Sequence, residues 1–155
     1  MKPFVKTLAA TLLAASTAGI ATVQASSHGG ADADEVVQTR KDIMAGIGGD
    51  MAVLVGVVKG ELVLSEKVIK RTLRGMHYLG HASKDAFREQ VSGSNVKTTA
   101  TADVWAQWDK FEGGLEKMNR RIAAAREAVG SDAFGPAMKD VGETCKNCHD
   151  NFRDK

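Results

Sequence analysis

Apolar residues recur with helical spacing in four segments of the chain, at about residues 32–58, 62–82, 104–129 and 136–152. Within each segment they fall three and four positions apart, which places them on one face of a helix. The first and last connections are short, whereas a polar stretch rich in Ser, Asn and Thr occupies residues 92–102. This pattern predicts an all-α fold, an antiparallel four-helix bundle with one long connection.

The same spacing assigns an inward face to each predicted helix. These faces consist of Val37, Met44, Ile47, Met51, Leu54 and Val58; Leu62, Ile69, Leu73, Met76 and Leu79; Trp108, Phe111, Leu115, Met118, Ile122, Ala125 and Val129; and Phe134, Met138, Val141, Cys145, Cys148 and Phe152. Asp32 or Asp34 is expected to cap the first helix and Asp103 the third, and Pro136 suits the first turn of the fourth.

One charged residue, Arg40, occupies a position on the inward face of the first helix. A buried guanidinium needs a partner, and the carboxylate of a bound group would serve. The alternative is an arginine that reaches solvent at the end of the bundle, and the pattern leaves both open. Three glycines, Gly46, Gly48 and Gly49, follow in the same helix and weaken it, so we expect a ring or another helix to pack closely against it there.

The last predicted helix carries Cys145-Lys146-Asn147-Cys148-His149, the C-x-x-C-H attachment motif of a c-type haem. Two thiols at this spacing can add to the two vinyl groups of one haem, and the following imidazole can then reach the iron. The chain contains only these two cysteines. We therefore predict one haem c bound through Cys145 and Cys148, with His149 as the iron ligand.

Two other uses of the cysteines are weaker. A redox dithiol of the thioredoxin type would sit near a βαβ unit, which this pattern lacks. A Cys2His2 zinc site would need two further ligands, and His77 and His81, four residues apart on the second helix, are the candidates. That set leaves His149 unexplained, and we expect His77 and His81 to be surface residues.

The first 25 residues have the three parts of a secretory signal peptide, with Lys2 and Lys6, an apolar run at residues 8–20 and a small-residue cleavage site ending at Ala25. We expect residues 26–155 to form one mature domain outside the cytoplasm. The run is too short to span a membrane comfortably. The leader has two lysines and no acidic residue, so the rest of the chain has 19 basic and 19 acidic residues, which argues against nucleic acid as a partner.

The chain resembles the cytochrome c′ family, the class II c-type cytochromes. The resemblance covers essentially the whole mature chain, and its most specific part is the C-terminal block. The residues that carry it are Arg40 to Met44, Ile47-Gly48-Gly49, Val58-Lys59-Gly60, Val104-Trp105, Phe111, Val141-Gly142, Cys145 to Asp150 and Phe152-Arg153. The resemblance implies a haem-carrying four-helix bundle in the bacterial periplasm, often a homodimer.

The resemblance also implies roles for single residues. Arg40 would lie near a haem propionate, and Arg153, one turn after His149, would lie near the iron-bound imidazole and tune it. Met44 falls where low-spin members of the family place a second iron ligand, while high-spin members leave that position open and bind NO or CO. Some high-spin members also carry a methionine there.

The leading hypothesis from the sequence is therefore a periplasmic single-electron carrier with His149 and Met44 as axial ligands, exchanging electrons with redox partner proteins. The alternative is a high-spin protein with a five-coordinate haem that binds NO or CO. No acid–base or nucleophile pair accompanies the motif, so we do not expect an enzyme.

Overall fold

A computed structural model describes residues 29–154, and the predicted leader lies outside them. The helices are α1 (Gly29–Val58), α2 (Glu66–Phe87), α3 (Asp103–Ala106), α4 (Trp108–Glu127) and α5 (Phe134–Phe152). Within these residues the only β-type pairing is an isolated bridge between Ala100 and Arg153. The all-α four-helix bundle predicted from the sequence is confirmed. Helix α3 is a short helix that precedes α4. No helix in this part of the chain is long and apolar enough to cross a membrane.

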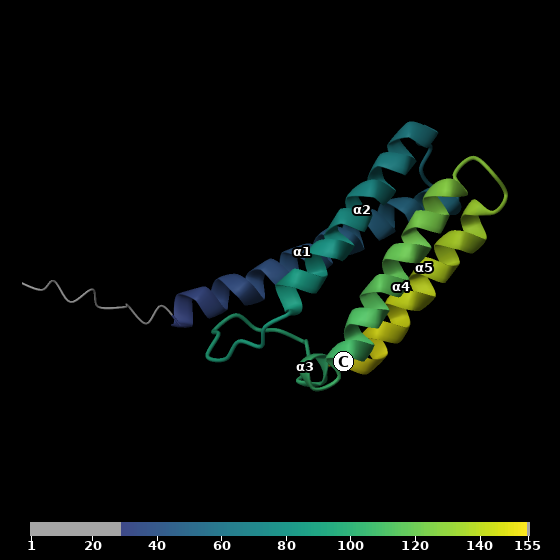
Figure 1. Cartoon of the computed structure of the whole chain (residues 1–155). Coiled ribbons are helices and arrows are strands. Elements are labelled where there is room, and N and C mark those ends of the chain that lie inside the picture. Colours follow the sequence, from purple (N-terminus) through teal and green to yellow (C-terminus); the bar gives the residue numbers. More distant parts are fainter. Residues whose placement is uncertain (1–28, 155) are drawn as a thin grey trace, which may run out of the picture.

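The four long helices lie side by side as two antiparallel pairs, α1 with α2 and α4 with α5 (Figure 1). Helix α2 packs along both α1 and α4, whereas α1 and α5 touch over a shorter stretch. The bundle is therefore closed on the α2–α4 side and looser between α1 and α5.

The predicted inward faces of the last two helices are confirmed almost throughout. The buried members are Phe111, Leu115, Met118, Ile122, Ala125 and Val129 from the third segment and Phe134, Met138, Val141 and Phe152 from the fourth. Both cysteines and Trp108 are partly buried against this core. Full burial of each Val, Leu, Ile, Phe or Met side chain stabilises the fold by about 1.5–3 kcal/mol. The 3.6-residue pattern therefore identifies the main source of stability.

The second helix begins later than predicted. Ser65 caps it by accepting a bond from the backbone N–H of Val68, and Leu62 lies in the preceding turn with 43% of its surface exposed. Leu62 was therefore wrongly assigned to the inward face, although its side chain contacts the α1 surface at Gly56. At the other end, α2 continues to Phe87 and buries that ring.

The predicted third helix is divided in two. Gln107, with φ −124° and ψ 45°, breaks the helical backbone between α3 and α4. The cap of α3 is Ala102 rather than Asp103, which instead lies in the first turn and accepts a hydrogen bond from the Gln107 side chain. The break places α3 at an angle beside the end of the bundle (Figure 1).

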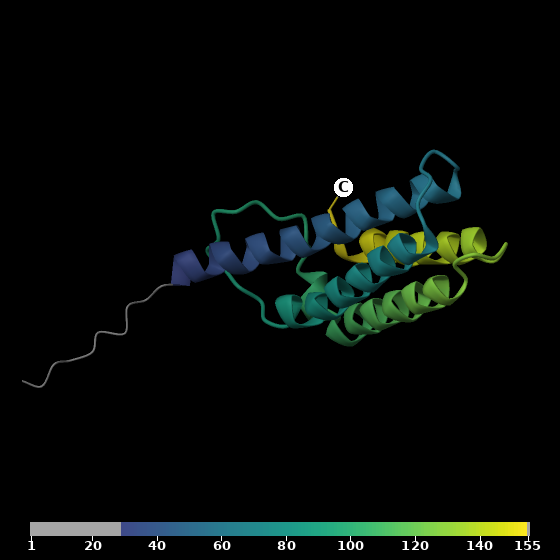
Figure 2. The same cartoon turned by 90° about the horizontal axis from the view of Figure 1, so that it is seen from above.

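The long connection between α2 and α3 is anchored to α1 and to the C-terminus. Asp34 was expected to cap α1, but α1 begins at Gly29, and the Asp34 carboxylate instead accepts hydrogen bonds from the Ser94 hydroxyl (2.8 Å) and the backbone N–H of Asn95 (2.6 Å). The other candidate cap, Asp32, also lies within α1. Figure 2 shows the connection passing α1 before it reaches α3.

The end of this connection pairs with the end of α5. The backbone N–H of Thr101 donates to the Phe152 carbonyl at 3.0 Å, and that of Asp154 donates to the Thr99 carbonyl at 2.8 Å. The segment at residues 97–101 is thereby held over the end of the gap between α1 and α5, where it forms part of a cavity wall.

Candidate functional site

A cavity of about 630 Å³ lies between α1, α4, α5 and the segment at residues 97–100. This volume is within the range of small-molecule and cofactor sites. Most of its wall is apolar, and both cysteines of the motif open onto it. The apolar and sulfur-containing residues of the wall are Met44, Ala45, Ile47, Met51, Phe87, Ala100, Val104, Phe111, Leu115, Met118, Cys145, Cys148 and Phe152.

The two cysteines are free thiols on the inward side of α5, both partly buried. Burial raises the pKa of both thiols, that of Cys148 to about 11. Both are therefore protonated at neutral pH, whereas a redox dithiol of the thioredoxin type depends on a lowered pKa. Across the cavity, Gly114 of α4 leaves room beside Cys148, because a Cβ at that position would lie 3.9 Å from the Cys148 sulfur.

His149 lies at the mouth of the cavity, one turn after Cys145. The residue is exposed at the surface, but desolvation of the ring at the cavity lowers its pKa. The nearby charge of Arg153 lowers the pKa of His149 further, and the charge of Asp150 partly opposes this. The imidazole is therefore neutral at pH 7, which is the form that binds a metal ion.

Met44 and Met51 lie on the wall that α1 contributes, with Gly48 between them. The three glycines of this helix have different surroundings. A Cβ at Gly46 would lie 2.9 Å from the Leu79 side chain of α2, so Gly46 permits close helix packing. Gly48 leaves the cavity wall bare, and Gly49 is exposed, with nothing near it. Close helix packing is thus confirmed at Gly46, while packing of a ring against Gly48 stays a prediction.

Arg40 is 4% exposed, so an arginine that reaches solvent is the wrong alternative. Its Nε donates to the Ala86 carbonyl at 2.7 Å, and its terminal nitrogen Nη2 donates to the Glu89 carbonyl. The guanidinium also lies between the rings of Phe87 and Trp105, at 5.3 and 5.2 Å from their centres. Backbone carbonyls at and just beyond the end of α2 therefore accept hydrogen bonds from the guanidinium, and the same side chain lines the cavity.

Arg153 ends α5 beside His149. Its Nε donates to the Thr99 hydroxyl at 3.2 Å, and its backbone N–H donates to the His149 carbonyl at 3.1 Å. The side chain is thus directed to the segment at residues 97–101, and Arg153 also lines the cavity.

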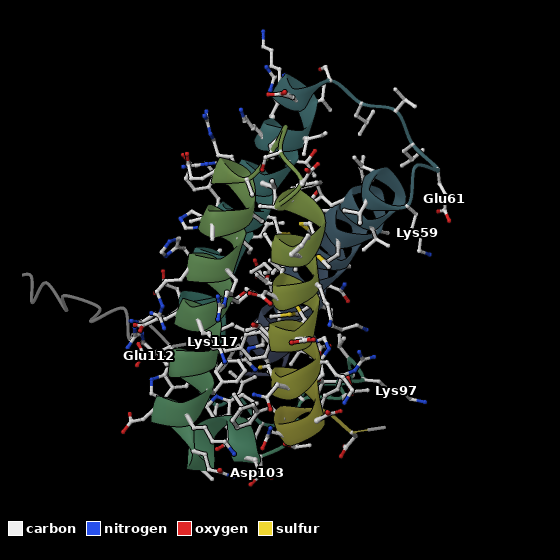
Figure 3. The ribbon with its side chains drawn as sticks, turned by 90° about the vertical axis from the view of Figure 1, so that its right-hand side faces the viewer. Lys59, Glu61, Lys97, Asp103, Glu112 and Lys117 are labelled. Carbon is white, nitrogen blue, oxygen red and sulfur yellow. The ribbon has the colours of Figure 1, made fainter. Side chains whose placement is uncertain are left out.

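Four cationic side chains line the cavity: Arg40, Lys41, Lys97 and Arg153. We call them the cationic rim. Sequence reasoning missed both lysines, because nothing in the pattern of the polar connection indicated that Lys97 would come to lie beside the cavity. Figure 3 shows Lys97 on the side of the molecule that carries the C-terminal half of α5. Such a rim suits a bound group that carries carboxylates.

His77 and His81 lie on α2, away from the residues that line the cavity. Among the described residues no group of three or more His, Cys, Asp or Glu side chains is arranged to hold a metal ion. The Cys2His2 zinc set is therefore wrong.

A family model described as Cytochrome C′ matches residues 35–153. The chain belongs to the cytochrome c′ family. A curated relative, the cytochrome c′ of Pararhodospirillum photometricum, is 31% identical over 127 residues, which cover 80% of this chain and 100% of the relative. The cytochrome c-556 of Rhodopseudomonas palustris is 28% identical over 129 residues, or 81% of this chain and 86% of that protein.

Solved structures of the family agree with the fold. The cytochrome c′ of Rhodobacter spheriodes superposes with a TM-score of 0.70 at 29% identity, covering 80% of this chain and 98% of that one. A nitric oxide complex of a mutant cytochrome c′ from Alcaligenes xylosoxidans gives a TM-score of 0.69 at 24% identity, covering 79% and 97%.

Members of this family carry a covalently attached c-type haem, and so does this chain. Its only two cysteines, Cys145 and Cys148, are the residues available for the attachment. The observed residues fit the group, because a largely apolar cavity of suitable size lies beside two protonated thiols, a neutral imidazole and a cationic rim.

Proposed function

We propose that this chain is a periplasmic cytochrome c′ that binds a small diatomic gas, NO or CO, at its haem. The observation that carries the proposal is the cavity wall opposite α5, where Met44, Ile47, Met51, Leu115 and Met118 present apolar and thioether groups. The mutant cytochrome c′ of Alcaligenes xylosoxidans, which has a similar fold, was solved as a nitric oxide complex. The haem supplies reversible gas binding and a one-electron change of its iron.

The chain's own residues hold the haem and set its surroundings. Cys145 and Cys148 would hold the haem, each through a thioether made when its thiol adds across one vinyl group, the sulfur bonding to one carbon and the proton going to the other. His149 presents an unprotonated ring nitrogen to the iron, because burial and Arg153 keep its pKa low. The cationic rim would pair with the carboxylates of the propionates.

In this proposal Met44 shields the gas site from α1 without binding the iron. Its thioether and the neighbouring Ile47 keep the wall apolar, so that a neutral diatomic molecule enters while water and anions gain little from entry.

A second candidate function is the one that the sequence favoured first, a single-electron carrier with His149 and Met44 as axial ligands. The position of Met44 on the cavity wall supports it. A thioether opposite an imidazole raises the reduction potential and keeps the iron six-coordinate.

One experiment separates the two functions. The absorption spectrum of the purified haem protein is recorded oxidised and reduced, with and without CO or NO, for the wild type, Met44→Ala and Met51→Leu. Gas binding predicts that the reduced wild type changes its spectrum with CO and that Met44→Ala binds CO faster. Met51→Leu is the control for a change elsewhere on the same wall.

The gas-binding proposal fails if the wild type has a low-spin spectrum that CO leaves unchanged and Met44→Ala alone becomes sensitive to CO. That result would make Met44 an iron ligand and the protein an electron carrier.

The periplasmic location is part of this proposal, since the predicted signal peptide at residues 1–25 lies outside the described part of the chain. A homodimer, a redox partner protein and the lack of an enzymatic activity also stay predictions. Fractionation of cells that express the full chain and sedimentation of the holoprotein test the location and the dimer.

A further inference from the structure

His77 and His81 form a pair on α2 that the haem function does not use. Their Nε2 atoms lie 3.2 Å apart, and the two rings meet edge to face with centres 4.6 Å apart. Positions four apart in a helix lie on the same face, so the backbone holds both imidazoles at one surface site.

This separation is the one that a shared metal ion requires. Two nitrogens each at about 2.0–2.1 Å from one ion are about 2.9–3.4 Å apart for angles at the metal between about 90° and 110°. The alternative is a hydrogen bond from one Nε2–H to the other Nε2, which the same distance permits.

The surroundings of His77 decide which of its nitrogens is available. Its Nδ1 is buried and has no hydrogen-bond partner, while its Nε2 faces His81. On the facing helix α4, Asn119 lies so close to Gly80 of α2 that a Cβ there would be 2.1 Å from the Asn119 amide oxygen. Because Nδ1 is buried and Nε2 lies beside the exposed His81, Nε2 is the nitrogen of His77 that an ion can reach.

The protonation state also suits a ligand. Burial lowers the pKa of His77, and the charges of His81 and Arg126 lower it further, although the backbone of Asn119 opposes this. The neutral ring does not have to lose a proton before it coordinates a metal ion.

We propose that His77 and His81 chelate one divalent transition-metal ion of the class that prefers imidazole, such as Zn²⁺ or Cu²⁺, at a surface site separate from the haem. Water completes the coordination, since no third His, Cys, Asp or Glu joins the pair in the described part of the chain. Such an open site binds more weakly than a closed four-ligand zinc site. It is independent of whether the haem binds gas or carries electrons.

The test is a Zn²⁺ titration of the untagged holoprotein by calorimetry, with thermal unfolding as a second measurement. All variants carry His28→Ala, because His28 lies outside the described residues and is a competing imidazole. In the holoprotein the haem iron occupies His149. The variants are His77→Ala and His81→Ala, and the control is Tyr78→Ala, which removes a neutral side chain that is 66% exposed on the same helix.

We expect one saturable Zn²⁺ site. The affinity for Zn²⁺ should be about tenfold or more lower in each histidine variant, because the chelate is lost. The affinity should not change in Tyr78→Ala. Zn²⁺ should raise the unfolding temperature only where both histidines are present, and the haem spectrum should stay the same. Absence of a saturable site, or equal affinity in the His28→Ala parent and in the parent that also carries His81→Ala, would overturn the proposal. Because His81 is exposed, its replacement keeps the test valid even if His77→Ala unfolds.

Discussion

Replacing Arg40 with alanine should destabilise the holoprotein more than replacing any exposed arginine. The last four carbonyls of a helix have no partner within it. At the end of α2 the Arg40 guanidinium bonds to the Ala86 carbonyl, and the Trp105 indole N–H bonds to the Phe87 carbonyl at 2.9 Å. Alanine would leave the Ala86 carbonyl buried without its partner, and would also remove the bond to Glu89.

The size of the effect follows from these contacts. Each hydrogen bond from a charged donor contributes about 1.5–3 kcal/mol, and each aromatic face contributes about 0.5–2 kcal/mol. Against this stands the cost of taking a guanidinium out of water, several kcal/mol after relaxation. We expect a net loss of about 3 kcal/mol in the free energy of unfolding for Arg40→Ala. Arg40→Lys should lose about half of that, because an ammonium cannot reach both carbonyls while lying between two rings.

The assay is urea unfolding of the holoprotein, followed by far-ultraviolet circular dichroism, in which the covalent haem stays attached. Arg88→Ala is the matched control, because Arg88 also lies over an aromatic ring, that of Trp108 at 5.9 Å, but at the surface. It should change stability by no more than about 0.5 kcal/mol. If Arg40→Ala costs less than about 1 kcal/mol, or no more than Arg88→Ala, the role given to the buried guanidinium is refuted.

Two further predictions test the packing and the long connection. Gly80→Ala places a methyl group against Asn119 and should lower the free energy of unfolding by about 1–3 kcal/mol. Gly113→Ala, in an open part of α4, should raise the free energy of unfolding by up to about 1 kcal/mol. Chemical unfolding measures both changes, and equal effects of the two variants would contradict the steric argument. Hydrogen bonds from Ser94 and Asn95 lower the pKa of Asp34, so they stabilise the fold at neutral pH and that contribution disappears as the pH falls through the lowered pKa. The protection factor of the Asn95 amide, which is its intrinsic exchange rate divided by its observed rate at the same pH, should fall correspondingly at acid pH, and a protection factor that is indifferent to Asp34→Asn at pH 7 would count against this.

Features that depend on local spacing were predicted well from the sequence. The inward faces of α4 and α5 depend only on which side of one helix is apolar, so Phe111 to Val129 and Phe134 to Phe152 were correctly assigned. The haem motif is local too, since five consecutive residues place two thiols and an imidazole on one helix.

Features that depend on distant partners were missed. Arg40 is paired with carbonyls 46 and 49 residues away, and Asp34 is paired with Ser94 and Asn95 about 60 residues away. Nothing in the spacing distinguishes these pairings from a helix cap or a surface position. Lys97 joins the cavity only because residues 97–101 pair with the end of α5.

The anchoring of Arg40 also bears on the choice between gas binding and electron transfer. Met44 follows Arg40 by four residues, so the two side chains share one face of α1, and both line the cavity. The bonds of Arg40 to the end of α2 fix the position of α1 at that turn, and with it the distance from Met44 to the opposite wall on α5. Whether the thioether reaches the iron is therefore set by the packing of α1 against α2 as much as by the presence of methionine. Arg40→Lys should therefore change the spectral response of the reduced protein to CO, whereas Arg88→Ala, at the surface, should leave that response unchanged.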